Sequence, residues 1–356
     1  MNNSEDAKEF ASLIGLVVVL LFSSPILSFS NSFQQAARED FGNETFSTSE
    51  GIKINNISST AQTLVTKGNE LVNKVKYQEA ITYYNQALAI DPRNINALLG
   101  IAETFSKLNR YDEATIYYDK ALTIQPINIS ILYSKADILP YLSRYDEAIA
   151  IYDKIFALNP HSSNALGRKA LALYDIGKLE DAITYFNKVL EMESNNNTAA
   201  MYYKALALDK LGNYEEAISV RDKILEIDPK DDIDTLDGIA LDHSHLGNDA
   251  KAIVYFDKVL AIDPYRMNVL LNKGNALNNL SRYSEAIFSF DRALDTYPDQ
   301  VIALNGKGKA LLRMGNYTGA ITFFDKVLSM NSSDIDITNE ASKNKIAAVN
   351  ALNNVG

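Results

Sequence analysis

The chain has 356 residues, a formal net charge of −11 and no cysteine. The absence of cysteine excludes a disulfide framework, a thiol nucleophile and zinc sites built on cysteine. The acidic balance argues against a nucleic-acid partner, because negative charges repel the phosphate backbone.

The first distinctive segment along the chain is apolar and runs from residue 10 to residue 27. Extended to Phe29 it reaches 20 residues, which is about 30 Å as a helix and long enough to cross a bilayer. We predict that residues 1–30 are an uncleaved membrane anchor. A cleaved secretory signal is the alternative, since small serines flank Phe29, but the preceding stretch is acidic, whereas such signals normally begin positively charged.

This segment sets the expected location of the protein. With an anchor, the rest of the chain stays attached to a membrane, and we favour the extracytoplasmic side. With a cleaved signal, the rest of the chain is secreted. Residues 31–60 are rich in Ser, Asn and Gln and are predicted to form a polar spacer.

An internal repeat occupies residues 61–334. The string Tyr-x-Glu-Ala-Ile, or a close variant, recurs with its alanine at intervals of 34 or 35 residues, and we place this alanine at position 20 of each unit. The alanines are Ala80, Ala114, Ala148, Ala182, Ala217, Ala252, Ala286 and Ala320. The eight units are 61–94, 95–128, 129–162, 163–196, 198–231, 233–266, 267–300 and 301–334.

Each unit is predicted to be a helix–turn–helix pair. Unit positions 4, 8 and 11 share one face of a first helix, and positions 17, 20, 24 and 27 share one face of a second helix. Position 8 is always Gly or Ala, and position 24 is aromatic except in unit five, where it is Arg221. Proline at position 32 of six units ends the second helix. Because one pair cannot bury its own apolar face, the units must stack into a solenoid.

These residues resemble the tetratricopeptide repeat (TPR) family. Within it they are similar to the archaeal and bacterial KGxAL variety, which is seen at residues 273–277 and 307–311. The resemblance implies an all-α fold, a right-handed superhelical α-solenoid of eight TPR-like repeats. It also implies that the first helices line a concave groove that binds a protein or a peptide.

Several features depart from the general repeat pattern. Lysine stands at position 7 in six units, and position 25 is acidic or asparagine, so a ladder of ion pairs between these two positions is a hypothesis. Pro140 is expected to bend or shorten the first helix of unit three. Residues 335–356 are predicted to form a capping helix that gives the last unit a polar outer face.

No constellation of catalytic residues is visible. The chain carries no phosphate-binding loop, dinucleotide fingerprint or nucleophile–histidine set. His243 and His245 point in different directions on a helix, and the acidic run at 228–237 is explained by helix caps. We therefore expect a protein that is not an enzyme, with no cofactor, no metal and no small-molecule substrate.

Candidate partner-binding residues come from the groove positions that the family resemblance implies. Tyrosines offer rigid contact area, asparagines can donate to and accept from a peptide backbone, and lysine adds positive charge. The candidates are Tyr133, Tyr141, Tyr174, Tyr202, Tyr203, Asn272, Asn275, Asn305 and Lys309. The carboxylate clamp with which some family members hold chaperone tails is missing, because Val65 and Ser134 stand where cations are needed.

The sequence thus favours a non-catalytic interaction scaffold that is membrane-associated or exported and binds a partner in its groove. A structural self-assembly protein is the alternative. An accessory subunit of a membrane complex shares the chemistry of the first hypothesis and cannot be separated from it by sequence.

Overall fold

The computed structural model describes residues 49–229, 232–330 and 334–355. These ranges contain seventeen α-helices, one short 3-10 helix and no strand. The predicted anchor at 1–30 lies outside the described residues. No helix within them combines the length and the apolar character that a membrane crossing requires.

The helices alternate between the first and second members of each unit. The first helices are α3 (Ser49–Asn73), α5 (Ile95–Lys107), α7 (Ile129–Ile138), α9 (Ser163–Asp175), α11 (Thr198–Lys210), α13 (Ile233–His245), α15 (Met267–Asn279) and α17 (Val301–Arg313). The second helices are α4 (Tyr77–Ile90), α6 (Tyr111–Ile124), α8 (Tyr145–Leu158), α10 (Leu179–Met192), α12 (Tyr214–Ile227), α14 (Asp249–Ile262), α16 (Tyr283–Thr296) and α18 (Tyr317–Ser329). The capping helix is α19 (Ile335–Val355).

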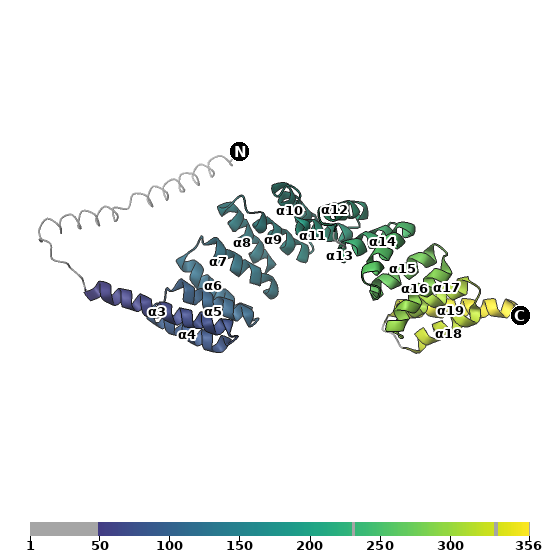
Figure 1. Ribbon diagram of the computed structural model, residues 1–356, viewed down its shortest axis with the longest axis horizontal. Helices are drawn as coiled ribbons and strands as arrows, with labels where there is room; N and C mark the ends of the chain where they lie inside the picture. The colour runs from purple at the N-terminus through teal and green to yellow at the C-terminus, as the bar shows by residue number, and fades with distance from the viewer. Residues whose placement is uncertain (1–48, 230–231, 331–333, 356) are drawn as a thin grey trace, which may run out of the picture.

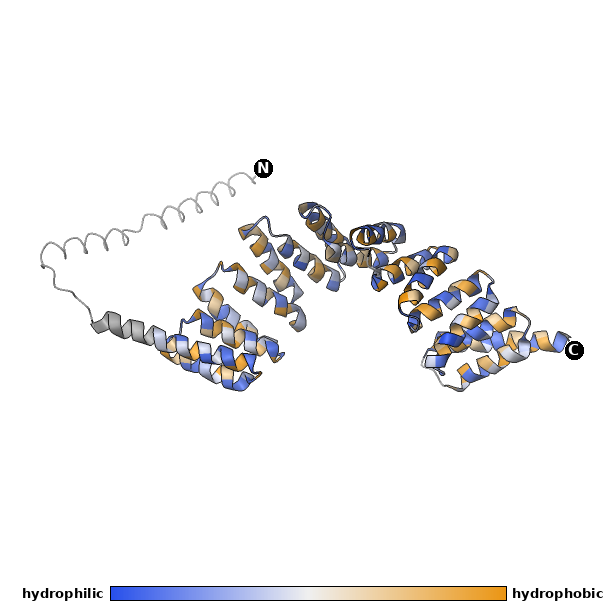
Figure 2. Cartoon of the chain, in the orientation of Figure 1, coloured by the Kyte–Doolittle hydropathy of each residue, from blue (hydrophilic) through white to orange (hydrophobic). Residues whose placement is uncertain are grey.

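The helices follow one another in a curved row (Figure 1), and each packs mainly on the helices before and after it. Helix α3 lies at one end of the row and α19 at the other. This all-α solenoid confirms the predicted fold class. Apolar and polar residues are interleaved along the coloured helices (Figure 2), because a helix of the row buries apolar side chains against its neighbours and leaves polar ones in water.

Side chains at the unit boundaries determine where the first helices begin. The Asn94 and Asn128 side chains accept hydrogen bonds from the backbone N–H groups of Ala97 and Ile131, which satisfies donors that a helix start leaves unpaired. Asp232 does the same at the start of α13. The acidic run at 228–237 therefore does contain a helix cap, as its interpretation from sequence requires.

Small residues and rings interlock in the core. The Tyr84 ring lies so close to Gly68 of its own unit and Gly100 of the next that a Cβ on either glycine would come within 2.5 Å of the ring. Phe290 lies in the same way between Gly274 and Gly306. The aromatic residue at position 24 therefore packs against both its own unit and the following one, which joins the units into one continuous core.

The predicted ladder of ion pairs exists, and it joins successive units. Lys135 Nζ lies 2.8 Å from Asp119 Oδ1, Lys169 Nζ lies 2.6 Å from Asp153 Oδ1, and Lys273 is paired with the acid of the preceding unit in the same way. In unit five the preceding unit offers asparagine instead, and Lys204 pairs with Glu216 of its own unit.

The expected effect of Pro140 is confirmed. Helix α7 ends at Ile138, and a 3-10 helix, η1 (Leu139–Leu142), completes the segment with the proline in its first turn. Tyr141 consequently lies in η1 and not on a first helix. Its side chain is 68% exposed, and its ring stacks on that of Tyr111 at 4.6 Å.

Helix α3 begins at Ser49, inside the segment that was expected to be a spacer. Residues 49–60 are therefore helical and continuous with the first helix of unit one. Once the repeat has nucleated a helix, each added residue gains a backbone hydrogen bond, and only a single glycine stands in this stretch to oppose it.

Candidate partner-binding groove

The first helices line the inner side of the curved row. Four pairs of successive first helices contact one another directly, namely α3 with α5, α9 with α11, α13 with α15 and α15 with α17, whereas no comparable contact joins successive second helices in the described ranges. The closer spacing places the first helices on the inside of the curve. Pockets on this face share lining residues from unit five to unit eight, so we treat them as one groove.

Tyrosines form the first part of the groove. The ring of Tyr203 stacks with Phe186 at a centroid distance of 6.2 Å and meets Tyr174 and Tyr202 edge-on. We call Tyr174, Tyr202 and Tyr203 the tyrosine cluster. A pocket of about 360 Å³, lined mainly by apolar atoms, lies beside Tyr203 between α9 and α11, and its shape suits an apolar side chain.

Tyr133 lies one unit before this cluster. Its hydroxyl is 2.7 Å from Ser162 Oγ, and the guanidinium of Arg168 lies 5.4 Å from its ring centroid. The structure therefore ties Tyr133 to the next unit. Among the five candidate tyrosines it brings together only the three members of the tyrosine cluster.

An acidic pocket follows between units five and six. It has a volume of about 440 Å³ and is lined by Tyr202, Leu206, Asp209, Tyr214, Arg221, Asp234, Asp237, Gly238, Leu241, Asp242 and His245. Burial raises the pKa of Asp237, an effect that Arg266 opposes and Asp234 reinforces. Oδ1 of Asp237 is buried without a hydrogen-bond partner.

Arg221 forms one wall of the acidic pocket. It stands at position 24, where the other units carry a ring, and it pairs with Asp209 of its own unit and Asp242 of the next. Gly238 makes room for it, since a Cβ there would collide with Arg221 Nε. Burial raises the pKa of Asp242 to about 7; Arg221 lowers it, and the charge of Asp209 raises it further.

The two histidines are accounted for by packing. His243 is buried beside the ring of Tyr255, and burial lowers its pKa. His245 stacks on Tyr214 at 4.6 Å. A small pocket of about 160 Å³ links this region to α15 and is lined by His245, Asp249, Asn272 and Asn275, among others.

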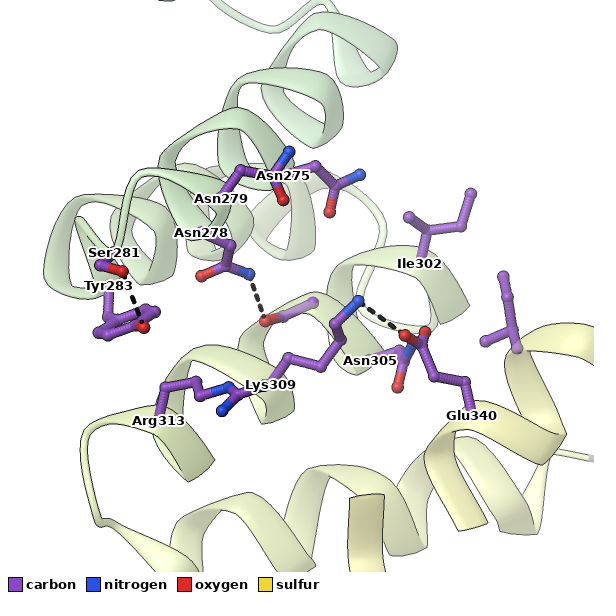
Figure 3. Close-up of a pocket in the computed structure, with 12 residues that line it drawn as sticks. Asn275, Asn278, Asn279, Ser281, Tyr283, Ile302, Asn305, Lys309, Arg313 and Glu340 are labelled. Atoms are coloured by element: carbon purple, nitrogen blue, oxygen red, sulfur yellow. Dashed lines mark hydrogen bonds and ion pairs between the residues drawn. The ribbon is translucent and has the colours of Figure 1, made fainter. Parts of the chain in front are cut away.

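The last part of the groove is an amide pocket between units seven and eight (Figure 3). Its volume is about 490 Å³, and it is lined by Asn275, Asn278, Asn279, Ser281, Tyr283, Ile302, Asn305, Gly306, Lys309, Arg313, Ile337 and Glu340. Asn278 Nδ2 donates a hydrogen bond to the carbonyl oxygen of Gly306, 3.0 Å away, which holds the two units together.

The structure thus brings Asn275, Asn305 and Lys309 into one pocket and places Asn272 next to it. Sequence reasoning missed Glu340, which reaches this pocket from the capping helix. It also missed the acidic pocket. The signal available for the latter was Arg221 at an aromatic position, because a buried arginine requires buried acids.

Comparisons with known families agree with this architecture. Models of the tetratricopeptide repeat match residues 75–137 and 271–335, and the model of anaphase-promoting complex, cyclosome, subunit 3 matches residues 144–224. No curated protein sequence matches the chain significantly.

Several solved structures are similar to this chain. The C-terminal part of a TPR repeat-containing protein from Cytophaga hutchinsonii is 16% identical with a TM-score of 0.58, over 67% of this chain and 97% of that one. YrrB, described as a TPR protein with an unusual peptide-binding site, is 21% identical with a TM-score of 0.44, over 52% of this chain and 95% of that one. MamA is 22% identical with a TM-score of 0.45, over 48% of this chain and 93% of that one.

At 16% identity the likeness to the Cytophaga hutchinsonii structure shows the fold and not the activity. The chain is an all-α tetratricopeptide-repeat solenoid, and the family-model matches support its place in the tetratricopeptide repeat family.

Proposed function

We propose that this protein is a non-catalytic scaffold that holds a peptide or partner protein in the groove of its first helices. The observation that carries the proposal is the continuity of the groove, since the tyrosine cluster, the acidic pocket and the amide pocket follow one another along one face. Aromatic anchors beside polar pockets are typical of surfaces that bind polypeptides. The fold is also typical of protein-interaction modules.

The groove changes its chemistry along its length, which gives a bound segment a direction. The acidic pocket favours a cationic side chain, and the amide pocket, with Lys309 and Arg313, favours an anionic or backbone group. A partner that matches both ends can bind in one orientation only.

We also assign the repeats, on residues 273–277 and 307–311, to the KGxAL variety.

Capture of partners by the full chain tests this proposal. The chain carrying Tyr202→Ala and Asn275→Ala is compared with the wild type in pull-downs from native membranes, with bound proteins identified by mass spectrometry. We expect the double variant to lose the partner, because both side chains line groove pockets. Phe288→Ala, an exposed position on second helix α16, is the matched control. Unchanged capture by the double variant contradicts the proposal that the partner binds in the groove.

We further propose that residues 1–30 anchor the protein in a membrane with the repeats on the extracytoplasmic side. The support is the length and apolar character of residues 10–29. Val18→Asp with Leu21→Asp is expected to move the chain from the membrane to the soluble fraction, because charge at the centre of a span is costly. N-terminal sequencing separates an anchor from a cleaved signal, since a chain that lacks its first residues contradicts the anchor.

Self-assembly through the capping helix is a second candidate. Helix α19 leaves Ile335, Ile346 and Leu352 exposed, and apolar residues at the end of an array are suited to contact with another copy. Light scattering on the full chain tests this candidate. If the wild-type chain scatters as a monomer and Ile346→Lys leaves its mass unchanged, this candidate is wrong.

A further inference from the structure

The capping helix places a carboxylate inside the amide pocket. Lys309 Nζ lies 2.7 Å from Glu340 Oε1, and Asn305 Nδ2 donates a hydrogen bond to Glu340 Oε2 at 2.6 Å (Figure 3). One cation and one neutral amide thus hold the two oxygens of one carboxylate. Asn305 and Lys309 both come from α17, so their spacing is fixed by that helix.

The charges around the pocket favour an anion. Burial by itself raises the pKa of Glu340, but Lys309, Asn305 and Lys343 lower it below its ordinary value, so the group is ionised. Arg313 lines the same pocket and has no acidic partner among the described residues. The pocket therefore contains a positive charge, that of Arg313, which Glu340 does not neutralise.

The contact with Glu340 is open to competition. The Lys309 side chain is 41% exposed and that of Glu340 is 43% exposed, and ion pairs this exposed to water contribute little to stability. The other atom of the Asn305 amide, Oδ1, is buried without a hydrogen-bond partner, as is Oδ1 of Asn278. Unpaired buried acceptors are unfavourable, and these two amide oxygens can accept hydrogen bonds only from donors, such as the backbone N–H groups of a bound chain.

We infer that the amide pocket is a carboxylate site for an acidic side chain of the bound partner, and that Glu340 occupies it as an internal competitor until the partner arrives. The inference rests on the proposed function, because it names the chemistry that one part of the groove selects. The occupant is a side-chain carboxylate, from Asp or Glu, since the group that fills the pocket here is itself a side chain on a polypeptide that continues in both directions.

Competition predicts a specific pattern of affinities. A site that is free only part of the time binds with an affinity reduced by that fraction. Removing the Glu340 carboxylate must therefore strengthen binding of an acidic segment, whereas removing the Lys309 ammonium must weaken it. A merely structural contact predicts neither change, because its loss affects the cap and not the ligand.

The test measures binding of labelled peptides to the full chain, kept soluble in mild detergent, by fluorescence anisotropy. The probe is a C-amidated peptide of Gly-Ser-Glu repeats, and the matched peptide carries Gln in place of Glu. We expect Glu340→Gln and Glu340→Ala to tighten binding of the Glu peptide by about threefold to fivefold and Lys309→Met to weaken it by about tenfold or more. Lys326→Met, an equally exposed lysine on second helix α18 that pairs with Asp299, should change nothing.

Several outcomes overturn the inference. Equal binding of the Glu and Gln peptides, weaker binding to both Glu340 variants, or no effect of Lys309→Met each removes it. A Gln peptide with a free C-terminal carboxylate that binds as well as the Glu peptide overturns the assignment to a side chain. No binding of the Glu peptide to wild type or to either Glu340 variant also overturns it. The proposed function is tested separately: unchanged partner capture by the variant carrying Tyr202→Ala and Asn275→Ala contradicts it.

Discussion

Arg221 donates a hydrogen bond from Nη1 to Oδ2 of Asp242, 2.5 Å away, across the boundary between units five and six. The two side chains are 3% and 2% exposed. In units seven and eight the same two unit positions carry Phe290 and Ala310. A buried ion pair therefore stands where units seven and eight have a phenyl ring and a methyl group.

Breaking this pair is expected to be costly. Above pH 7, where Asp242 is ionised, Arg221→Phe leaves it buried without its counter-charge and should lower the free energy of unfolding by about 3–5 kcal/mol. Adding Asp242→Ala reproduces the pairing found between units seven and eight and should recover most of that loss. Denaturant unfolding of the two variants measures both values. A double variant no more stable than Arg221→Phe alone contradicts this account.

The same site predicts a pH dependence. Burial raises the pKa of Asp242 to about 7, far above its value in an unfolded chain, so the folded state binds the extra proton. The contribution of this group to stability is therefore largest at low pH and is lost as pH rises through about 7. The stability difference between wild type and Asp242→Asn should decline from about pH 5 to about pH 8. Glu191→Gln, an exposed position, is the control, and an equal slope there contradicts the assignment.

The close approach of first and second helices predicts the effect of a single methyl group. A Cβ at Gly274 would lie 2.6 Å from Phe290 Cε1, so Gly274→Ala should destabilise the array by about 1–3 kcal/mol through overpacking. At Gly167 the nearest atom is Val189 Cγ2 at 3.9 Å, and Gly167→Ala should stabilise its helix by about 0.5–1 kcal/mol. Thermal melting compares the two. Equal shifts would show that helix propensity and not packing decides at both sites.

The turn between the two helices of every unit needs one residue with a positive φ. Four units use glycine for it, as at Gly212 with φ 76°, but unit one uses Val75 with φ 61° and unit two Asn109 with φ 57°. A β-branched residue is strained in this conformation, whereas asparagine tolerates it. Val75→Gly should therefore stabilise the protein by about 1 kcal/mol, and Asn109→Gly should change it by much less. Denaturant melts of both variants check this, and a loss of stability on Val75→Gly contradicts it.

Most of the fold was predictable from the repeat period. The first helices of units two to eight begin where the register opens each unit, at Ile95 and Ile129 for example, because the caps and the apolar positions are local and recur. The shortening of α7 by Pro140 was predictable for the same reason, since proline acts on its own helix. The boundary at Ser49 was not predictable, because polar residues there extend a helix that the repeat has already begun.

The candidate site was predictable only in part. Unit positions on the first helices indicated Asn305 and Lys309 as groove residues, and the amide pocket contains both. Nothing in the local sequence indicated that Glu340, 31 residues after Lys309, completes it. The acidic pocket needed contacts between units as well, since Arg221 meets Asp242 of the next unit.

By itself, the sequence determined the helical repeat, its register, the ladder of lysine and aspartate and the absence of the known carboxylate clamp. Each of these depends on residue identity at a fixed spacing, which a period of 34 or 35 residues makes visible. Only the tertiary structure decided which polar groups meet across unit boundaries. Those contacts depend on how one unit is rotated against the next, and that rotation results from the packing of many side chains at once.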